Sequence, residues 1–343
     1  GTIGKAAGVP PVALRNEVLS RGDLIELHVE GDEPVLGEKA VFSGDYVVSR
    51  EGRIRLPFLG DFRAEGRTPE ALSADISRAL SSGEFYNEPP RTTVILSGLS
   101  VARVNVGGAV FEPRPLELGG AGSGPIDERR QQARGASTEA RNLTAALRQA
   151  GGVRPDADLS AVQVRRGGRI YQLDQRPVLD GRDFEDVMHV SGDEVNVPSR
   201  LCFQDDHMVP SPISPPGISL FLSNLVQPTQ GNAPAAIGRE ARQVPYGTRL
   251  MQGVVSTNCV GGVRATNANR TVALFSRNPI TEVSVVVERR IEDMRVRQDR
   301  DDFDPYLLPG DAMACYDSGV TALADAARVL GIVGGAVLLA GAN

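Results

Sequence analysis

Apolar and polar residues alternate along residues 45–66, DYVVSREGRIRLPFLGDFRAEG, on both sides of a turn at Glu51-Gly52. The apolar positions of this alternation share one side, and they are Val48, Ile54 and Leu56. A period of two predicts a β-hairpin with one buried face. Pro57 then ends one strand, and Gly60-Asp61 starts another.

A helix is predicted directly after this segment, over residues 68–80, TPEALSADISRAL. Thr68 fits an N-cap and Pro69 the first helical position. Apolar residues then recur every four positions, at Leu72, Ile76 and Leu80, so that the helix has one apolar stripe. The stretch TTVIL, at residues 92–96, is predicted to return the chain as a strand.

The rest of the chain contains an internal repeat. One copy starts with a strand at 101–110 and continues over 143–198, and the other runs from about 244 to 318. Each copy reads as a short helix, a Gly-Gly stop, a strand hairpin, and a Gly-Asp turn into a final strand. The strand-like run ISLFLSNLV, at 218–226, is predicted to open the second copy, after an extended Pro-rich connection containing PSPISPP.

The segment Gly52–Gly60 reads G-x-I-x-L-P-x-L-G and lies in the order strand, strand, helix, strand. It resembles the polysaccharide export domain of bacterial outer-membrane polysaccharide export proteins, the Wza-like family, rather than an arbitrary small α+β domain. The two repeats resemble the β-grasp domains, called SLBB domains, that follow the export domain in that family. The resemblance covers roughly residues 12–318.

The predicted fold class is therefore α+β: an export domain, two SLBB-like β-grasp domains and a carboxyl-terminal apolar helix. The expected organisation is a leader at 1–11, the export domain at 12–99, a first β-grasp domain at 100–200, a Pro-rich connection at 201–217, a second β-grasp domain at 218–319, and the apolar helix at 320–343. Gly1 is not expected to be a native start. Family members often carry a lipidated amino-terminal Cys that these residues lack, so lipidation stays open.

Residues 320–343, VTALADAARVLGIVGGAVLLAGAN, differ from everything before them because their only charges are Asp325 and Arg328. A helix from Val320 to Gly341 spans roughly 33 Å, close to the thickness of a bilayer's hydrocarbon core. Small residues recur every four positions, which favours close helix packing: Ala327, Gly331 and Gly335. Family members can form a helical barrel through the outer membrane with such segments. This segment lacks Trp and Tyr and has little polarity, so it is predicted to insert but is not assigned a pore lining. The alternatives are a helix packed on its own domain and a fraying tail.

The composition argues against several other functions. A net charge of −6 gives no electrostatic footprint for nucleic acid. The three histidines, His28, His189 and His207, have no metal-site spacing, and no P-loop, dinucleotide or nucleophile-elbow motif is present. The Gly-Asp pairs at 22–23, 44–45, 60–61, 192–193 and 310–311 are read as turns before strands, not as acid and base catalysts. We therefore predict no enzyme activity, no cofactor and no metal.

Three cysteines are unusual for a secreted chain, in which thiols are normally paired. A disulfide between Cys259 and Cys315 would lie within the second repeat, at the end of its first helix and in its last strand. Cys202 is then expected to be free and buried. The odd count also permits an intramolecular or intermolecular pairing of Cys202.

The resemblance implies an outer-membrane, largely periplasmic translocon subunit for capsular or exopolysaccharide. Identical subunits would form a ring, octamer-like in the family, that encloses a conduit for the polysaccharide chain. The partner would be an inner-membrane polysaccharide co-polymerase, often a tyrosine autokinase. Residues in the matching motif that are expected to shape the ring entrance and face the glycan are Arg53, Arg55, Phe58 and Arg63. A monomeric periplasmic glycan-binding module is the alternative function.

Overall fold

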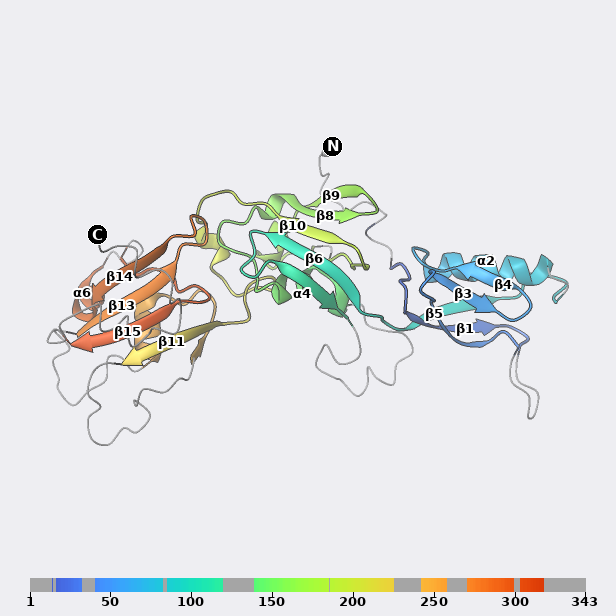
Figure 1. Ribbon diagram of the computed structural model, residues 1–343, viewed down its shortest axis with the longest axis horizontal. Helices are drawn as coiled ribbons and strands as arrows, with labels where there is room; N and C mark the ends of the chain where they lie inside the picture. Colours follow the sequence, from blue (N-terminus) through green and yellow to red (C-terminus); the bar gives the residue numbers. More distant parts are fainter. Residues whose placement is uncertain are drawn as a thin grey trace, which may run out of the picture. The chain divides into compact units, whose positions relative to one another are not determined.

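The computed structural model describes residues 14, 17–32, 41–82, 85–119, 139–184, 186–224, 242–257, 270–298 and 303–317. The fold is mixed α+β, with several sheets and few helices (Figure 1). Two compact units divide the chain, one of residues 1–153 and 157–200 and the other of residues 154–156 and 201–343. The change of unit at Arg200/Leu201 coincides with the start of the predicted Pro-rich connection. Among the described residues, no helix combines the length and the hydropathy that crossing a membrane requires.

The amino-terminal domain, blue in Figure 1, combines a three-stranded sheet, a two-stranded hairpin and one helix. The sheet has the order β2-β1-β5, and the hairpin pairs β3 with β4. The elements are β1 (Leu24–Val29), β2 (Gly44–Val47), β3 (Arg53–Leu56), β4 (Gly60–Arg63), α2 (Pro69–Ser82) and β5 (Thr92–Gly98). Both contacts of β1 with its neighbours are antiparallel.

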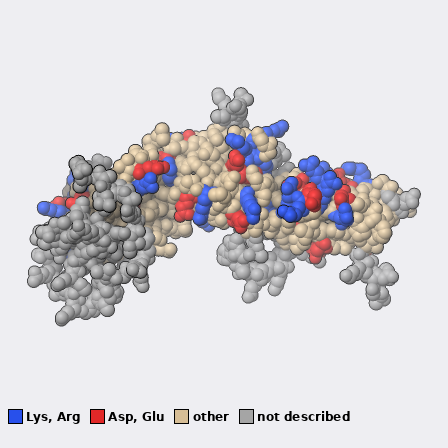
Figure 2. Space-filling model, in the orientation of Figure 1, with Lys and Arg blue, Asp and Glu red and all other residues tan. Residues whose placement is uncertain are grey.

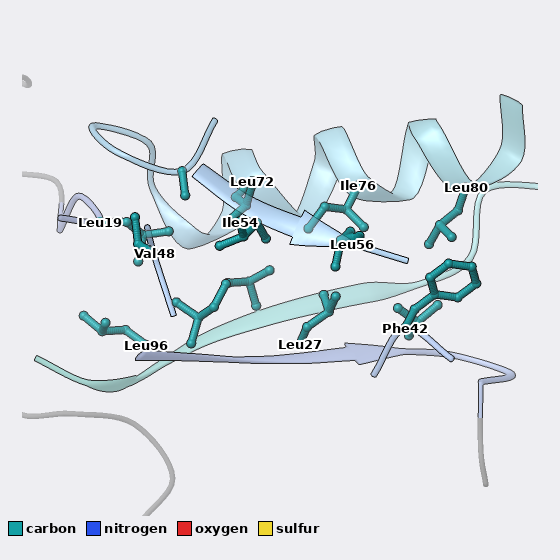
Figure 3. Packing of buried hydrophobic residues seen from close by; sticks show 14 residues of the cluster. Leu19, Leu27, Phe42, Val48, Ile54, Leu56, Leu72, Ile76, Leu80 and Leu96 are labelled. Atoms are coloured by element: carbon teal, nitrogen blue, oxygen red, sulfur yellow. The ribbon is translucent and has the colours of Figure 1, made fainter. Parts of the chain in front are cut away.

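Helix α2 forms as its sequence predicts. The Thr68 hydroxyl accepts a hydrogen bond from the Ala71 N–H at 3.2 Å, and Pro69 is the first helical residue. Leu72, Ile76 and Leu80 are fully buried. In Figure 3 these three side chains extend from the helix toward the hairpin and the sheet, where Ile54 and Leu56 of β3 and Leu27 of β1 complete the core.

The hairpin differs from the prediction in its partner strand. Strand β2 pairs with β1, and β3 pairs with β4, so the turn at Glu51-Gly52 joins strands of two different sheets. The turn is closed locally, because the Ser49 N–H donates to the Arg53 carbonyl at 2.8 Å and the Gly52 N–H to the Ser49 carbonyl at 2.9 Å. The alternation of apolar residues indicated the buried face correctly, but a period of two does not identify the neighbouring strand.

Two five-stranded sheets follow, and they have the same topology. Their orders are β7-β6-β10-β8-β9 and β12-β11-β15-β13-β14. Numbered within each sheet, both orders read second, first, fifth, third, fourth, and the first and fifth strands are parallel in both. The internal repeat of the sequence therefore corresponds to a repeated sheet, although its assignment to the SLBB family stays a prediction.

The first of these sheets lies in the same unit as the amino-terminal domain. Its elements are β6 (Ala102–Gly108), β7 (Arg114–Leu118), α4 (Leu143–Gln149), β8 (Val162–Arg166), β9 (Arg169–Leu173) and β10 (Glu194–Val197). Helix α4 packs on β6 and β7. The Gly-Gly stop after the helix is formed by Gly151 and Gly152, which both have positive φ.

The second five-stranded sheet lies in the other unit. Its elements are β11 (Ile218–Asn224), β12 (Arg242–Val244), α5 (Leu250–Ser256), β13 (Arg270–Arg277), β14 (Ser284–Arg290), α6 (Ile291–Val296) and β15 (Ala312–Asp317). Strand β11 begins where the sequence predicted the opening strand. Short 3₁₀ turns at Glu139–Arg141, Leu159–Ala161, Arg176–Val178 and Asp205–His207 complete the described elements.

The Pro-rich connection is folded rather than extended. Ile213 is fully buried, and Ser214 is 3% exposed. The Ser214 N–H donates to the Ser211 carbonyl at 3.2 Å, and the Ser214 hydroxyl accepts from the Ser211 N–H at 2.7 Å. Proline permits turns as well as extended chain, and here burial of Ile213 and the serine hydrogen bonds select the turn.

Candidate functional site

The candidate glycan-facing residues lie together on the β3–β4 hairpin. Strand β3 alternates exposed arginines with buried Ile54 and Leu56, so Arg53 and Arg55 share the outward face. The register places Arg53 opposite Arg63 and Arg55 opposite Asp61. We call these four residues, Arg53, Arg55, Asp61 and Arg63, the hairpin face. In Figure 2 basic side chains gather over the amino-terminal domain, with acidic side chains among them.

Only half of the hairpin face is neutralised by its own residues. The Arg55 Nε lies 2.8 Å from the Asp61 Oδ1. The hydrogen bond from Arg55 lowers the pKa of the Asp61 carboxyl and raises the pKa of the Arg55 guanidinium. The side chains of Arg53 and Arg63 form no hydrogen bond or ion pair with any other described residue. The positive charge of Arg53 acts on the Asp61 carboxylate only through space and helps to lower its pKa. Two cations therefore face each other across the strand pair.

Phe58 occupies the tip of the hairpin in an unfavourable backbone conformation. Its φ is +62°, and the Leu59 N–H donates to the Pro57 carbonyl at 2.7 Å, which defines a three-residue turn with a left-handed centre. The side chain is 83% exposed. Its ring centroid lies 6.1 Å from that of Phe85, which in turn stacks edge-on against buried Phe42 at 5.3 Å.

A second cluster, which sequence reasoning missed, joins the amino-terminal domain to the sheet that follows it. Arg141 is fully buried, and its Nη1 lies 3.1 Å from Oδ1 of Asp23, which is also fully buried. The same guanidinium donates to the Ser20 hydroxyl at 2.8 Å and to the His189 carbonyl at 3.2 Å. Burial lowers the pKa of Arg141, and the charges of Asp23 and Asp193 oppose that change.

Asp193 continues this cluster on the side of the first five-stranded sheet. Its carboxylate accepts two hydrogen bonds from Arg166, at 2.9 and 2.7 Å, and lies 2.8 Å from Nδ1 of buried His189. Burial raises its pKa, but the hydrogen bonds from Arg166 and His189 outweigh burial, so the pKa is lowered. The residues come from positions far apart in the sequence, and no spacing pattern could have brought Arg141 to Asp23 and His189.

The Gly-Asp turns have the role that the sequence predicted at three of the five positions. The carboxylate accepts the N–H of the residue three positions earlier at Asp23, Asp193 and Asp311, with distances of 2.7, 3.1 and 2.8 Å. Asp193 and Asp311 precede the final strands of the two repeated sheets. The two carboxyl groups differ in pKa: that of Asp193 is lowered, whereas burial raises the pKa of Asp311 to about 7.

The structure tests the predictions for two of the three cysteines, Cys202 and Cys315. Cys315, in β15, is disulfide-bonded. Cys259 lies outside the described residues, so its pairing with Cys315 stays a prediction. Cys202 is free, but it is exposed rather than buried, because it lies in the bend after the last strand of the first sheet and not in a core. The packing residues Ala327, Gly331 and Gly335, with the whole segment 320–343, also lie outside the described residues.

Comparison with known proteins shows what the amino-terminal domain is similar to. Residues 12–97, which contain the hairpin face and α2, match the family model for polysaccharide biosynthesis/export proteins. The chain is 27% identical over 197 residues to the EPS I polysaccharide export outer membrane protein EpsA of Ralstonia solanacearum, covering 56% of this chain and 47% of that protein. It is 26% identical over 233 residues to the EpsA protein of the same description from Ralstonia nicotianae, covering 66% and 54%.

The amino-terminal domain is thus a polysaccharide export domain. This match agrees with the family that the sequence resembles, and it covers the amino-terminal domain of the chain. It spans about half the length of the two curated relatives that it matches.

Proposed function

We propose that this chain is an outer-membrane polysaccharide export protein, placed largely in the periplasm, that acts as one subunit of a translocon for capsular or exopolysaccharide. The family match over residues 12–97 carries the proposal. The names of the two relatives, which are polysaccharide export outer membrane proteins, support it. The proposed role is transport by architecture rather than by catalysis.

The finer proposal is a ring of identical, octamer-like subunits that encloses a water-filled conduit. A conduit must release its polymer at every step, so it needs weak, hydrated contacts rather than a deep pocket. Two properties of the chain are compatible with this requirement: Trp is absent, and aromatic residues make up only 5% of the sequence. The export domains would lie at the periplasmic end of the ring, next to an inner-membrane polysaccharide co-polymerase or tyrosine autokinase.

The apolar segment 320–343 is the proposed membrane anchor of each subunit. Its support is the run from Val329 to Gly341, which contains no polar side chain. A variant ending at Gly319 should still fold its sheets, but it should leave the membrane fraction after cell lysis. If this variant stayed in the outer membrane, segment 320–343 would not be the anchor. The match of residues 12–97 to the export family would be unaffected.

The first test is the mass and projected shape of the detergent-extracted full-length protein, by light scattering and electron microscopy of one sample. A closed ring with a central cavity supports the translocon. A stable monomer at high concentration that binds glycan would instead favour the alternative, a periplasmic glycan-binding module. Complementation of a strain deleted for the gene, read as polysaccharide in the medium, tests export itself.

A further inference from the structure

The hairpin face combines two like charges with full solvent access. Arg53 and Arg63 are directly opposite in the β3–β4 register, and both are exposed. Cross-strand neighbours have Cβ atoms about 5 Å apart, and like charges in that position destabilise a strand pair. An anion between the two guanidinium groups would convert this repulsion into attraction, and carboxylates fit the fork of an arginine side chain well.

The positive charge of this segment is local. Residues 50–67 contain five arginines and three carboxylates, which gives a net charge of +2, whereas the whole chain carries −6. A polyanion is therefore repelled by the net charge of the whole chain, while the surplus of arginines in this segment attracts it locally. Arg55 is already paired with Asp61, so Arg53 and Arg63 are the groups left to hold a ligand charge.

Phe58 adds an apolar platform at the tip of the same hairpin. A phenylalanine with φ of +62° has a strained backbone, because residues with a Cβ rarely adopt this region. The strained turn presents an aromatic ring that is 83% exposed, so burial in the core does not compensate the cost. Glycine would adopt this backbone conformation without strain. The reason for a phenylalanine here therefore lies in its side chain.

We propose that the hairpin face and Phe58 form a binding surface for an acidic polysaccharide, a glycan that carries carboxylates along its chain. Arg53 and Arg63 hold a carboxylate, and the apolar face of a sugar ring further along the polymer packs on Phe58. This proposal rests on the proposed export function and names the chemical class of the exported polymer. The contacts are few and exposed, as a sliding polymer requires.

The spacing of the two parts predicts a dependence on the length of the glycan. Five residues separate Arg53 from Phe58, which is roughly 16 Å of extended strand. A single sugar does not reach both, so only an oligomer contacts the charges and the ring together. Galacturonic acid, oligogalacturonates of increasing length and polygalacturonate are suitable probes, with dextran as the neutral counterpart.

The charge test uses titration of these probes against the full-length protein and two double variants with the same change in net charge. Arg53→Gln/Arg63→Gln should weaken polygalacturonate binding about tenfold and flatten its salt dependence. The control Arg103→Gln/Arg165→Gln removes two exposed arginines of the first five-stranded sheet that are paired with Glu117 and Glu194, and it should bind as the parent does. Equal weakening by both, or equal binding of dextran, overturns the proposal.

The aromatic test uses Phe58→Gly with Glu282→Gly as its matched control, because Glu282 also has positive φ, +59°, in the other unit. Both variants relieve strain and should unfold at the same or a higher temperature than the parent. Phe58→Gly alone should weaken binding of long oligogalacturonates several-fold while leaving galacturonic acid unchanged. Unchanged binding of every length would remove Phe58 from the surface.

The failure of this inference is distinguishable from failure of the proposed function. If the parent restores export to the deletion strain and Arg53→Gln/Arg63→Gln exports as much polymer and binds polygalacturonate as tightly, the protein exports polysaccharide and the acidic-glycan surface is wrong. If the parent binds polygalacturonate through these arginines but restores no export, the export role fails and the surface stands. Binding of duplex DNA with equal affinity and the same arginine dependence would overturn the choice of glycan.

Discussion

Replacing Arg141 by Met should release the contact between the export domain and the first five-stranded sheet. The change keeps the length of the side chain but removes the charge and three hydrogen bonds, to Asp23, Ser20 and the His189 carbonyl. Both Arg141 and Asp23 are fully buried. Breaking a buried pair by removing one partner costs about 3–5 kcal/mol, because the remaining charge stays buried without compensation.

The loss of stability caused by Arg141→Met should lie at the lower end of that range. The Asp23 carboxylate keeps three other donors, the Ser20 N–H at 2.7 Å, the Ser100 N–H at 2.8 Å and the Ser100 hydroxyl at 2.7 Å. These hydrogen bonds continue to stabilise its charge when the guanidinium is gone. We therefore expect a loss of about 3 kcal/mol in local stability.

Amide hydrogen exchange of the full-length protein measures this loss where it occurs. Exchange in β1 and β10, which lie on either side of the contact, should accelerate roughly a hundredfold, since 1.4 kcal/mol corresponds to a factor of ten. Arg103→Met is the control, because Arg103 forms an exposed ion pair with Glu117 at 3.2 Å that contributes less than about 1 kcal/mol. The double variant Asp23→Asn/Arg141→Met should recover part of the loss. Acceleration below about threefold in Arg141→Met would refute the reasoning.

Three further outcomes test other parts of the structure. Burial raises the pKa of the Asp311 carboxyl to about 7, so the stability that Asp311 contributes to the second sheet should be greatest below about pH 4 and fall until about pH 7. In thermal melts taken across pH, Asp311→Asn should lack this contribution. Gly108→Ala should destabilise the first sheet by several kcal/mol in urea titrations, because its Cβ would lie 2.1 Å from the Val197 carbonyl oxygen and φ is +84°. Burial raises the pKa of Asp32, but N–H donors from three consecutive residues outweigh it and lower the pKa. The stability that Asp32 contributes should therefore be present above about pH 4 and be lost as the pH falls through its lowered pKa. Thermal melts of Asp32→Asn over the same pH range should not show this loss.

Local sequence rules predicted the elements whose cause is local. Helix α2 begins at the predicted Pro69 and buries the predicted stripe, because capping and a period of four depend only on neighbouring residues. The repeat was visible for the same reason: each copy carries its own turn residues, and each folds into its own sheet of identical order. The motif also singled out Arg53, Arg55, Phe58 and Arg63, and the structure brings them together on the β3–β4 hairpin.

Pairing across the chain required the tertiary structure. Alternation along 45–66 showed which side chains are buried, but the partner of β3 is β4 and not β2, a choice made by the packing of Ile54 and Leu56 between α2 and the sheet. The exposure of Cys202 and the folded Pro-rich connection likewise depend on what surrounds them.

The sequence by itself determined the resemblance of the amino-terminal domain to polysaccharide export proteins, the helix with its apolar stripe, the repeat and the outward arginines of the hairpin. Only the tertiary structure decided that Arg53 faces Arg63, that Phe58 is strained, and that Arg141 meets Asp23 118 positions away in the chain. The physical reason is that hydrophobic periodicity and capping act within a few residues, whereas register and buried ion pairs are fixed by packing among distant segments.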